Sequence, residues 1–202
     1  MAYAAGGLDE GLSLVIAVHL GVCPACRATV RICEAIGGQM LAVSETADMS
    51  GNALSQALGR LDEPAAPRAH LPRSAARLGF NMPHALASYR LGNWRWVAPG
   101  IRLVRILPLT AGRSGLNLLR VSPGVAVPCH THAGLELSCI LTGSYVDETG
   151  HFRPGDLAEM DGDGDHRPVA DPRYGCICLI ASDGRLRFRS LLPRLLRPVL
   201  GF

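Results

Sequence analysis

Two histidines and a glutamate at even spacing are the residues of this chain best suited to metal chemistry. His130, His132 and Glu136 lie in the run Gly124-Val-Ala-Val-Pro-Cys-His-Thr-His-Ala-Gly-Leu-Glu-Leu-Ser-Cys-Ile-Leu-Thr-Gly143. Successive side chains of a strand point to opposite faces, so these three would share one face if the segment is extended. Two imidazoles and a carboxylate suit zinc or non-haem iron, nickel or manganese. The run therefore predicts a metal site.

The spacing of this run resembles the first motif of the cupin family, G-x5-H-x-H-x3-E-x6-G. The resemblance implies a β-barrel that holds zinc or another divalent transition metal. It also implies one more histidine ligand from a later strand, after a Pro-Gly turn. Pro154-Gly155 fits that turn, and His166 is the implied donor. The alternative interpretation makes the histidines surface residues of an all-β loop.

A second set of donors, His19, Cys23 and Cys26, lies near the N-terminus with the spacing His-x3-Cys-x2-Cys. Residues 8 to 20 predict a buried helix, and a second helix is expected from Cys23-Pro24 to a glycine stop at Gly37-Gly38. The two thiolates at the start of this helix could bind one ion together with His19. Such an ion would stabilise two short helices that have little core of their own. A redox pair or ordinary buried cysteines are the alternatives, although redox motifs usually accompany a βαβ pattern, which is absent.

Tyr3-Ala-Ala-Gly6 and His19-Leu-Gly-Val-Cys-Pro-Ala-Cys-Arg27 resemble the zinc anti-sigma domain of ChrR-type anti-sigma factors, in which a cupin domain follows. The resemblance implies zinc at this site and, as partner, a sigma factor of the extracytoplasmic-function (ECF) type. The family has a further histidine ligand ahead of the tyrosine, and this sequence has none before Tyr3. We expect water, Glu10 or a partner group to complete the zinc coordination, and we expect the site to hold zinc more weakly than the cupin site.

The remaining pattern predicts an α+β protein, with a small zinc-stabilised helical domain followed by an antiparallel β-sandwich or barrel of cupin type. A stripe on residues 53–61 predicts a third helix, which either packs on the first two helices or contacts a partner. Residues 63–74 are rich in Pro, Ala and Arg and predict a linker. We place the helical domain at residues 1–75 and the cupin-like domain at 76–202, where short strands bounded by Gly or Pro recur.

Charge is distributed unevenly along the chain. Residues 1 to 63 carry seven acidic and three basic side chains, whereas residues 64 to 202 carry ten acidic and seventeen basic ones. An acidic N-terminal part argues against direct nucleic-acid binding and favours a basic protein partner. No segment has the length of apolar sequence that a membrane helix needs, and no export signal is recognisable, so we expect a cytoplasmic protein without membrane contact.

The seven cysteines are expected to be thiols or metal ligands, because the cytosol keeps thiols reduced. Cys129, Cys139, Cys176 and Cys178 are either inert buried thiols or, near a metal, oxidation sensors. The apolar tail, residues 191–202, could cover a barrel edge or form a homodimer through the cupin domain.

Two hypotheses of function follow. In the first, the N-terminal zinc domain sequesters a sigma factor, and the cupin domain senses a signal that ends the inhibition; the resemblance implies oxidative stress, with singlet oxygen or organic peroxides as the signal. In the second, the cupin domain is a metal-dependent oxygenase, isomerase or hydrolase, and the N-terminal part is a docking element. The tandem of two metal motifs favours regulation without catalysis.

Overall fold

The computed structural model describes residues 1–63, 80–107, 114–161, 166–184 and 186–188, without the side chains of Asp62, His132 and residues 186–188. The expected linker and the C-terminal tail lie largely outside the described residues, so the division at residues 75 and 76 stays a prediction. These residues contain three α-helices and two 3₁₀ turns: α1 (Glu10–Val22), α2 (Pro24–Ala42), α3 (Ala53–Gly59), η1 (Arg60–Asp62) and η3 (His84–Leu86).

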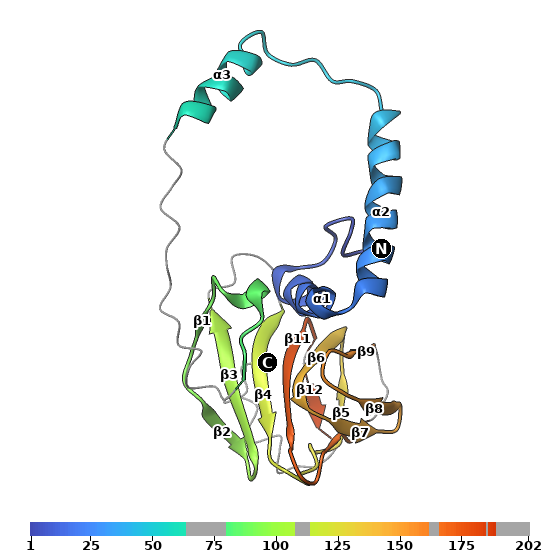
Figure 1. Cartoon of the computed structure of the whole chain (residues 1–202), viewed down its shortest axis with the longest axis vertical. Coiled ribbons are helices and arrows are strands. Elements are labelled where there is room, and N and C mark those ends of the chain that lie inside the picture. Colours follow the sequence, from blue (N-terminus) through green and yellow to red (C-terminus); the bar gives the residue numbers. More distant parts are fainter. Residues whose placement is uncertain (64–79, 108–113, 162–165, 185, 189–202) are drawn as a thin grey trace.

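The strands follow in chain order: β1 (Arg90–Leu91), β2 (Arg95–Ala98), β3 (Ile101–Leu107), β4 (Gly115–Val121), β5 (His130–His132), β6 (Glu136–Gly143), β7 (Tyr145–Asp147), β8 (Gly150–Phe152), β9 (Leu157–Met160), β10 (Val169–Ala170), β11 (Cys176–Ser182) and β12 (Leu186–Phe188). A seven-stranded sheet has the order β1-β3-β4-β11-β6-β9, with β2 paired to β3. Two smaller sheets, β10-β7-β8 and β12-β5, complete the β part, and all pairs are antiparallel. The expected α+β fold with an antiparallel sandwich is confirmed (Figure 1).

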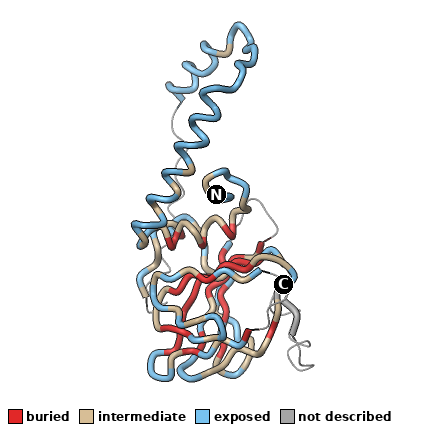
Figure 2. Tube along the Cα trace, turned by 90° about the vertical axis from the view of Figure 1, so that its right-hand side faces the viewer, coloured by how far each residue is buried: buried red, intermediate tan, exposed pale blue. Residues whose placement is uncertain are grey.

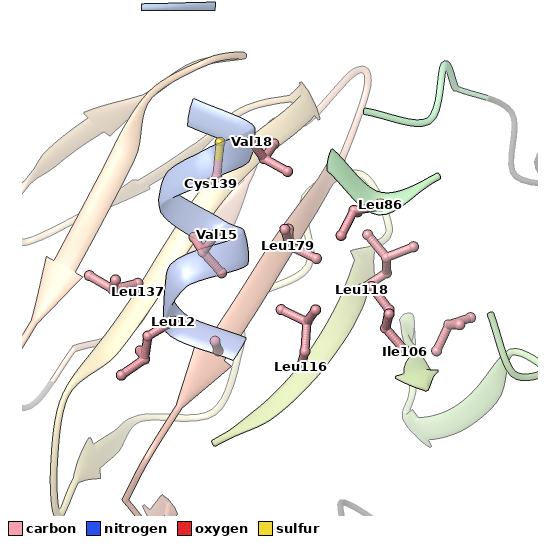
Figure 3. Close-up of a cluster of buried hydrophobic side chains, with 12 residues drawn as sticks. Leu12, Val15, Val18, Leu86, Ile106, Leu116, Leu118, Leu137, Cys139 and Leu179 are labelled. Carbon is pink, nitrogen blue, oxygen red and sulfur yellow. The ribbon is translucent and has the colours of Figure 1, made fainter. Parts of the chain in front are cut away.

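Helix α1 lies on the outer face of the large sheet (Figures 1 and 3). Its residues Leu12, Val15 and Val18 recur at i, i+3 and i+6, and they are at most 6% exposed. They share one core cluster with side chains from the 3₁₀ turn η3 and from four strands: Leu86, Val104, Ile106, Leu116, Leu118, Leu137, Cys139, Leu179 and Ala181. Burial of each such side chain stabilises the fold by about 1.5–3 kcal/mol. The first helix is therefore part of the core of the β-sandwich.

The polar residues at the start of α1 tie the same helix to the β part. Asp9 is the N-cap and accepts a hydrogen bond from the Leu12 amide (3.2 Å). Its other carboxylate oxygen accepts from the amide of Ser114 (2.9 Å), just before β4. The Tyr89 hydroxyl donates to Glu10 (2.7 Å), and burial together with this contact raises the pKa of Tyr89 to about 12. These contacts fix the register of α1 on the sheet.

Strands β6 and β11 are largely buried on both faces because both faces are covered. In register, Leu137 and Cys139 of β6 lie beside Ala181 and Leu179 of β11 and face α1. The alternate residues face the interior between the sheets, where a second cluster contains Ile101, Val121, Ile140, Tyr145, Ala158, Ala170, Cys176 and Cys178. Glu136 shares parity with Ile140, so its side chain belongs to this interior face.

Helices α2 and α3 extend away from the sandwich and have no buried residue (Figures 1 and 2). Helix α2 does not stop at Gly37-Gly38, as the sequence suggested, but continues to Ala42. A glycine costs a helix interior only about 1 kcal/mol relative to alanine, which lowers helix stability without ending the helix. Among the described residues, no helix combines the length and apolar character that a membrane span requires.

Candidate metal centres

His19, Cys23 and Cys26 form the first candidate metal centre. One ligand atom from each lies within 4.8 Å of the others. His19 is in the last turn of α1, and Cys23 is both the C-cap of α1 and the N-cap of α2. The Cys23 amide donates to the His19 carbonyl (2.9 Å), which closes the corner between the helices. The structure therefore brings together the three donors that the sequence predicted.

The two thiols of this centre differ in acidity. A hydrogen bond from the Cys26 backbone amide, followed by the Cys26 side chain, lowers the pKa of Cys23. The hydrogen bond between the two side chains raises the pKa of Cys26, because Cys26 keeps its proton and donates it to the Cys23 thiolate. A thiolate at the N-terminus of a helix is the form that binds metal and reacts. Two thiol donors and an imidazole match the donor types of a structural zinc site.

Glu10, one of the groups expected to complete this centre, does not belong to it. Glu10 begins α1 and His19 lies nine positions later, so at 1.5 Å rise per residue they are separated by roughly 13 Å along the helix. Glu10 instead accepts the hydrogen bond of Tyr89. The proposal of Glu10 as fourth ligand is therefore wrong, because a helix carries the two side chains to opposite ends.

His130, Glu136 and His166 form the second candidate centre, and all three are buried. Their ligand atoms also lie within 4.8 Å of one another. His130 is on β5 and pairs across an isolated bridge with His166, while Glu136 begins β6. Three of the four predicted donors are thus brought together, but not by alternation along a single strand. Residues 133–135 turn the chain between two strands of different sheets. The backbone of His132 lies in β5 beside His130, and its side chain lies outside the described part.

The hydrogen bonds of the two histidines decide which ring nitrogen faces the centre. His130 Nδ1 lies 2.7 Å from the Pro128 carbonyl oxygen, and His166 Nδ1 lies 3.4 Å from Asp147 Oδ2. These oxygens only accept, so each Nδ1 carries the proton and each Nε2 presents a lone pair. The two Nε2 atoms are 3.0 Å apart. Two nitrogen ligands of one zinc ion, at 2.0–2.1 Å and a right or tetrahedral angle, are separated by roughly 2.9–3.4 Å. The arrangement fits a shared cation.

Burial also changes the acidity of Glu136, the third donor. Loss of hydration raises the pKa of Glu136 to about 8. A bound divalent cation would favour the ionised form and oppose this effect. Without a cation the site favours a protonated carboxyl, and with one it offers a carboxylate ligand.

Asp147 is a partner that the sequence pattern did not reveal. Its side chain is fully buried, and it holds His166 through one oxygen while the other accepts from the amide of Thr149 (2.9 Å) and of Gly150 (3.2 Å). The run Asp-Glu-Thr-Gly signals a turn after β7, and the Asp147 contacts form that turn. Nothing in the local sequence indicates that the same carboxylate reaches residue 166.

Most cysteines of the sandwich are poorly placed to react, because their side chains are buried. Cys139, Cys176 and Cys178 are buried, and Cys129 is half-buried. Burial raises the pKa of Cys139 to about 11, and the Cys176 side chain together with burial raises that of Cys178. The Cys139 and Cys178 thiols are therefore held protonated, which disfavours the thiolate form that an oxidation sensor needs.

A helical module with two thiol donors, joined to a cupin-type sandwich that carries a second cluster of His and Glu donors, defines a class of two-part proteins with two candidate metal centres. Residues 85–184 match the family model described as ChrR cupin-like domain. Over 98% of its length the chain is 40% identical to the anti-sigma-E factor ChrR of Cereibacter sphaeroides, of which it covers 92%. The structure of Rhodobacter sphaeroides SigE in complex with the anti-sigma ChrR contains a similar chain, with a TM-score of 0.72 and 37% sequence identity. The match covers 90% of this chain and 93% of that chain. The chain belongs to the ChrR family of anti-sigma factors.

This assignment separates the two hypotheses raised by the sequence. The regulatory hypothesis is confirmed at the level of the family, and the cupin-enzyme alternative is not favoured, because the relationship extends over both parts of the chain.

Proposed function

We propose that this chain sequesters an ECF-type sigma factor with helices α2 and α3, and releases it when the cupin domain registers oxidative stress. The proposal has zinc at His19, Cys23 and Cys26, and zinc or another divalent transition metal at His130, His132, Glu136 and His166. A sigma factor acts on RNA polymerase, so the proposed partner places the chain in the cytoplasm without direct contact to nucleic acid. A homodimer through the cupin domain stays a prediction.

The observation that carries the proposal is the apolar surface of α2 and the segment α3–η1. Ile32, Ile36 and Met40 recur every four residues on α2 and are 49–68% exposed. Leu54, Leu58 and Leu61 make a second stripe on α3 and η1 and are 53–78% exposed. Apolar stripes of this kind usually face a core or a partner. No residue of either helix is buried, so a partner is the occupant that would remove these side chains from water.

The charge of the N-terminal part and the relationship to ChrR indicate the kind of protein that the partner is. The acidic balance of residues 1 to 63 complements a basic protein surface. The related ChrR chain is found in a complex with SigE. Release then requires that the signal change the relative free energies of the bound and free states.

The test is co-purification of the full chain with a sigma factor encoded beside it. We expect the double variant Ile36→Asp/Met40→Asp to weaken capture at least tenfold, because it places charges in the apolar stripe. Tyr174→Asp is the matched control: Tyr174 is 70% exposed in the turn before β11 of the sandwich. Equal capture by the double variant and the wild-type chain would contradict the proposed surface.

A further inference from the structure

A direct hydrogen bond connects the first metal centre with the cupin sandwich. His19 Nδ1 lies 2.7 Å from the carbonyl oxygen of Gly155, which is 136 positions later in the chain. Gly155 belongs to the turn between β8 and β9, and His19 is in the last turn of α1. His19 is buried by this contact and by the packing of α1.

The contact selects the nitrogen that His19 offers to an ion. A carbonyl oxygen has no proton to give, so Nδ1 carries the hydrogen and donates it. The lone pair is then on Nε2, and this is the nitrogen available beside Cys23 and Cys26. Metal-bound histidines commonly donate their other ring N–H to a carbonyl or carboxylate, which orients the ring and raises its basicity.

The Gly155 carbonyl is itself held by the sandwich. The Gly155 amide donates to the Ile140 carbonyl (2.8 Å), and the Ile140 amide donates to the Asp156 carbonyl (3.1 Å). Asp156 Oδ2 accepts from the Arg153 amide (2.7 Å) and closes the turn. Gly155 has φ +92°, which favours glycine, and an added Cβ would lie 3.2 Å from Val22 Cγ2 of α1. Ile140 is on β6, the strand that begins at Glu136 of the second centre.

We propose that the Gly155 carbonyl is a positioning group for the first metal centre, so that the cupin fold sets how tightly the N-terminal site holds its ion. The inference rests on the proposed metal site at His19, Cys23 and Cys26. It deepens that proposal by making the site dependent on a turn of the other part of the chain. A movement of this turn would change the orientation of His19 without touching either cysteine.

The test measures cobalt binding to the full chain, since cobalt bound by thiolates gives a charge-transfer absorption in the near ultraviolet. His130, Glu136 and His166 contain no thiol, so this absorption reports the first centre. Gly155→Ala introduces backbone strain and contact with Val22, and Asp156→Ala loosens the turn without a positive-φ penalty. Gly124→Ala is the matched control, because Gly124 has φ +70° and its added Cβ would meet nothing within 4 Å.

We expect Gly155→Ala to weaken cobalt binding at the thiolate centre about tenfold or more, as loss of such a partner does in other metal sites. Asp156→Ala should act in the same direction, and Gly124→Ala should leave the affinity as in the wild-type chain. Zinc affinity from chelator competition should fall in parallel. Wild-type cobalt affinity in Gly155→Ala would overturn the positioning role, even with sigma capture intact. Failure of the wild-type chain to capture a sigma factor would instead overturn the proposed function and leave the cobalt comparison valid.

Discussion

The Nε2 atoms of His130 and His166 lie 3.0 Å apart, and each ring donates its Nδ1–H to an oxygen acceptor. One of those acceptors is a backbone carbonyl and the other is the buried carboxylate of Asp147. The second centre therefore depends on a carboxylate that does not belong to the predicted ligand set. The electrostatic support from Asp147 can be tested by substitution.

We expect Asp147→Asn to weaken zinc binding at the second centre about 10–100-fold, the usual cost of losing a partner of a ligating histidine. The amide retains an acceptor for the turn but removes the negative charge beside His166. The measurement is chelator competition with the full chain. Thr149→Ala is the control, because it deletes only the hydroxyl that donates to the other oxygen of Asp147 (2.6 Å). Equal zinc affinity for Asp147→Asn and Thr149→Ala would contradict the role of the carboxylate charge.

The free energy of unfolding of the metal-free chain should depend on pH through the carboxyl group of Glu136. Its folded pKa of about 8 exceeds its ordinary value of 4.5, so the folded state binds more protons between these values. The free energy of unfolding from this group is therefore greatest below pH 4.5 and falls as pH rises toward 8, by at most about 1.4 kcal/mol per pH unit. Urea unfolding of chelator-treated protein at pH 5 to 8 should show a decline that Glu136→Gln flattens. Parallel pH profiles for the two chains would refute this assignment.

Leu12 tests whether α1 belongs to the core of the sandwich. Leu12→Ala should lower the free energy of unfolding by about 2–5 kcal/mol, because Leu12 is 3% exposed among strand residues. Leu54→Ala on α3 removes a side chain that is 71% exposed and should change stability by no more than about 0.5 kcal/mol. Urea midpoints followed by tryptophan fluorescence report the sandwich, since Trp94 packs against this core. If the Leu12→Ala chain and the wild-type chain had the same urea midpoint, α1 would not share a core with the sandwich.

Variants of the two candidate centres should differ in how they affect capture and release of a sigma factor. We expect Cys23→Ser to abolish capture, because the zinc proposed at the α1–α2 corner would lose a thiolate ligand. The double variant His130→Ala/His132→Ala should capture normally but release poorly when peroxide or singlet oxygen is applied. Capture and release can be followed by pull-down before and after treatment. Full capture by Cys23→Ser would remove zinc from the inhibitory role, and normal release by the double variant would remove the second centre from sensing.

Short-range patterns in the sequence predicted most strands, and the structure brings together six of the seven proposed donors, His132 having no described side chain. Residues 101–107, between Gly100 and Pro108, form one of the expected short strands. The errors arose where tertiary contacts decide. Residues 125–127, between Gly124 and Pro128, form only a bridge at Ala126, and β5, β8 and β10 are two or three residues long, too short for a readable period.

Contacts distant in the sequence could not be predicted. The apolar face of α1 indicated a buried helix, but its periodicity is the same whether the helix packs on other helices or on a sheet. The contacts of His19 with Gly155 and of His166 with Asp147 depend on the path of the chain through the sandwich. Neither is encoded by the spacing of metal ligands, so the structure was needed to find both.

The placement of α1 has a practical consequence for dividing this protein into fragments. A fragment starting at residue 76 would keep every described strand yet remove α1 from the core that it shares with Leu137 of β6 and Leu179 of β11. An uncovered leucine surface of that kind promotes aggregation. Recombinant versions of the sensor half should therefore begin ahead of Asp9, so that the sheet retains its helical cover.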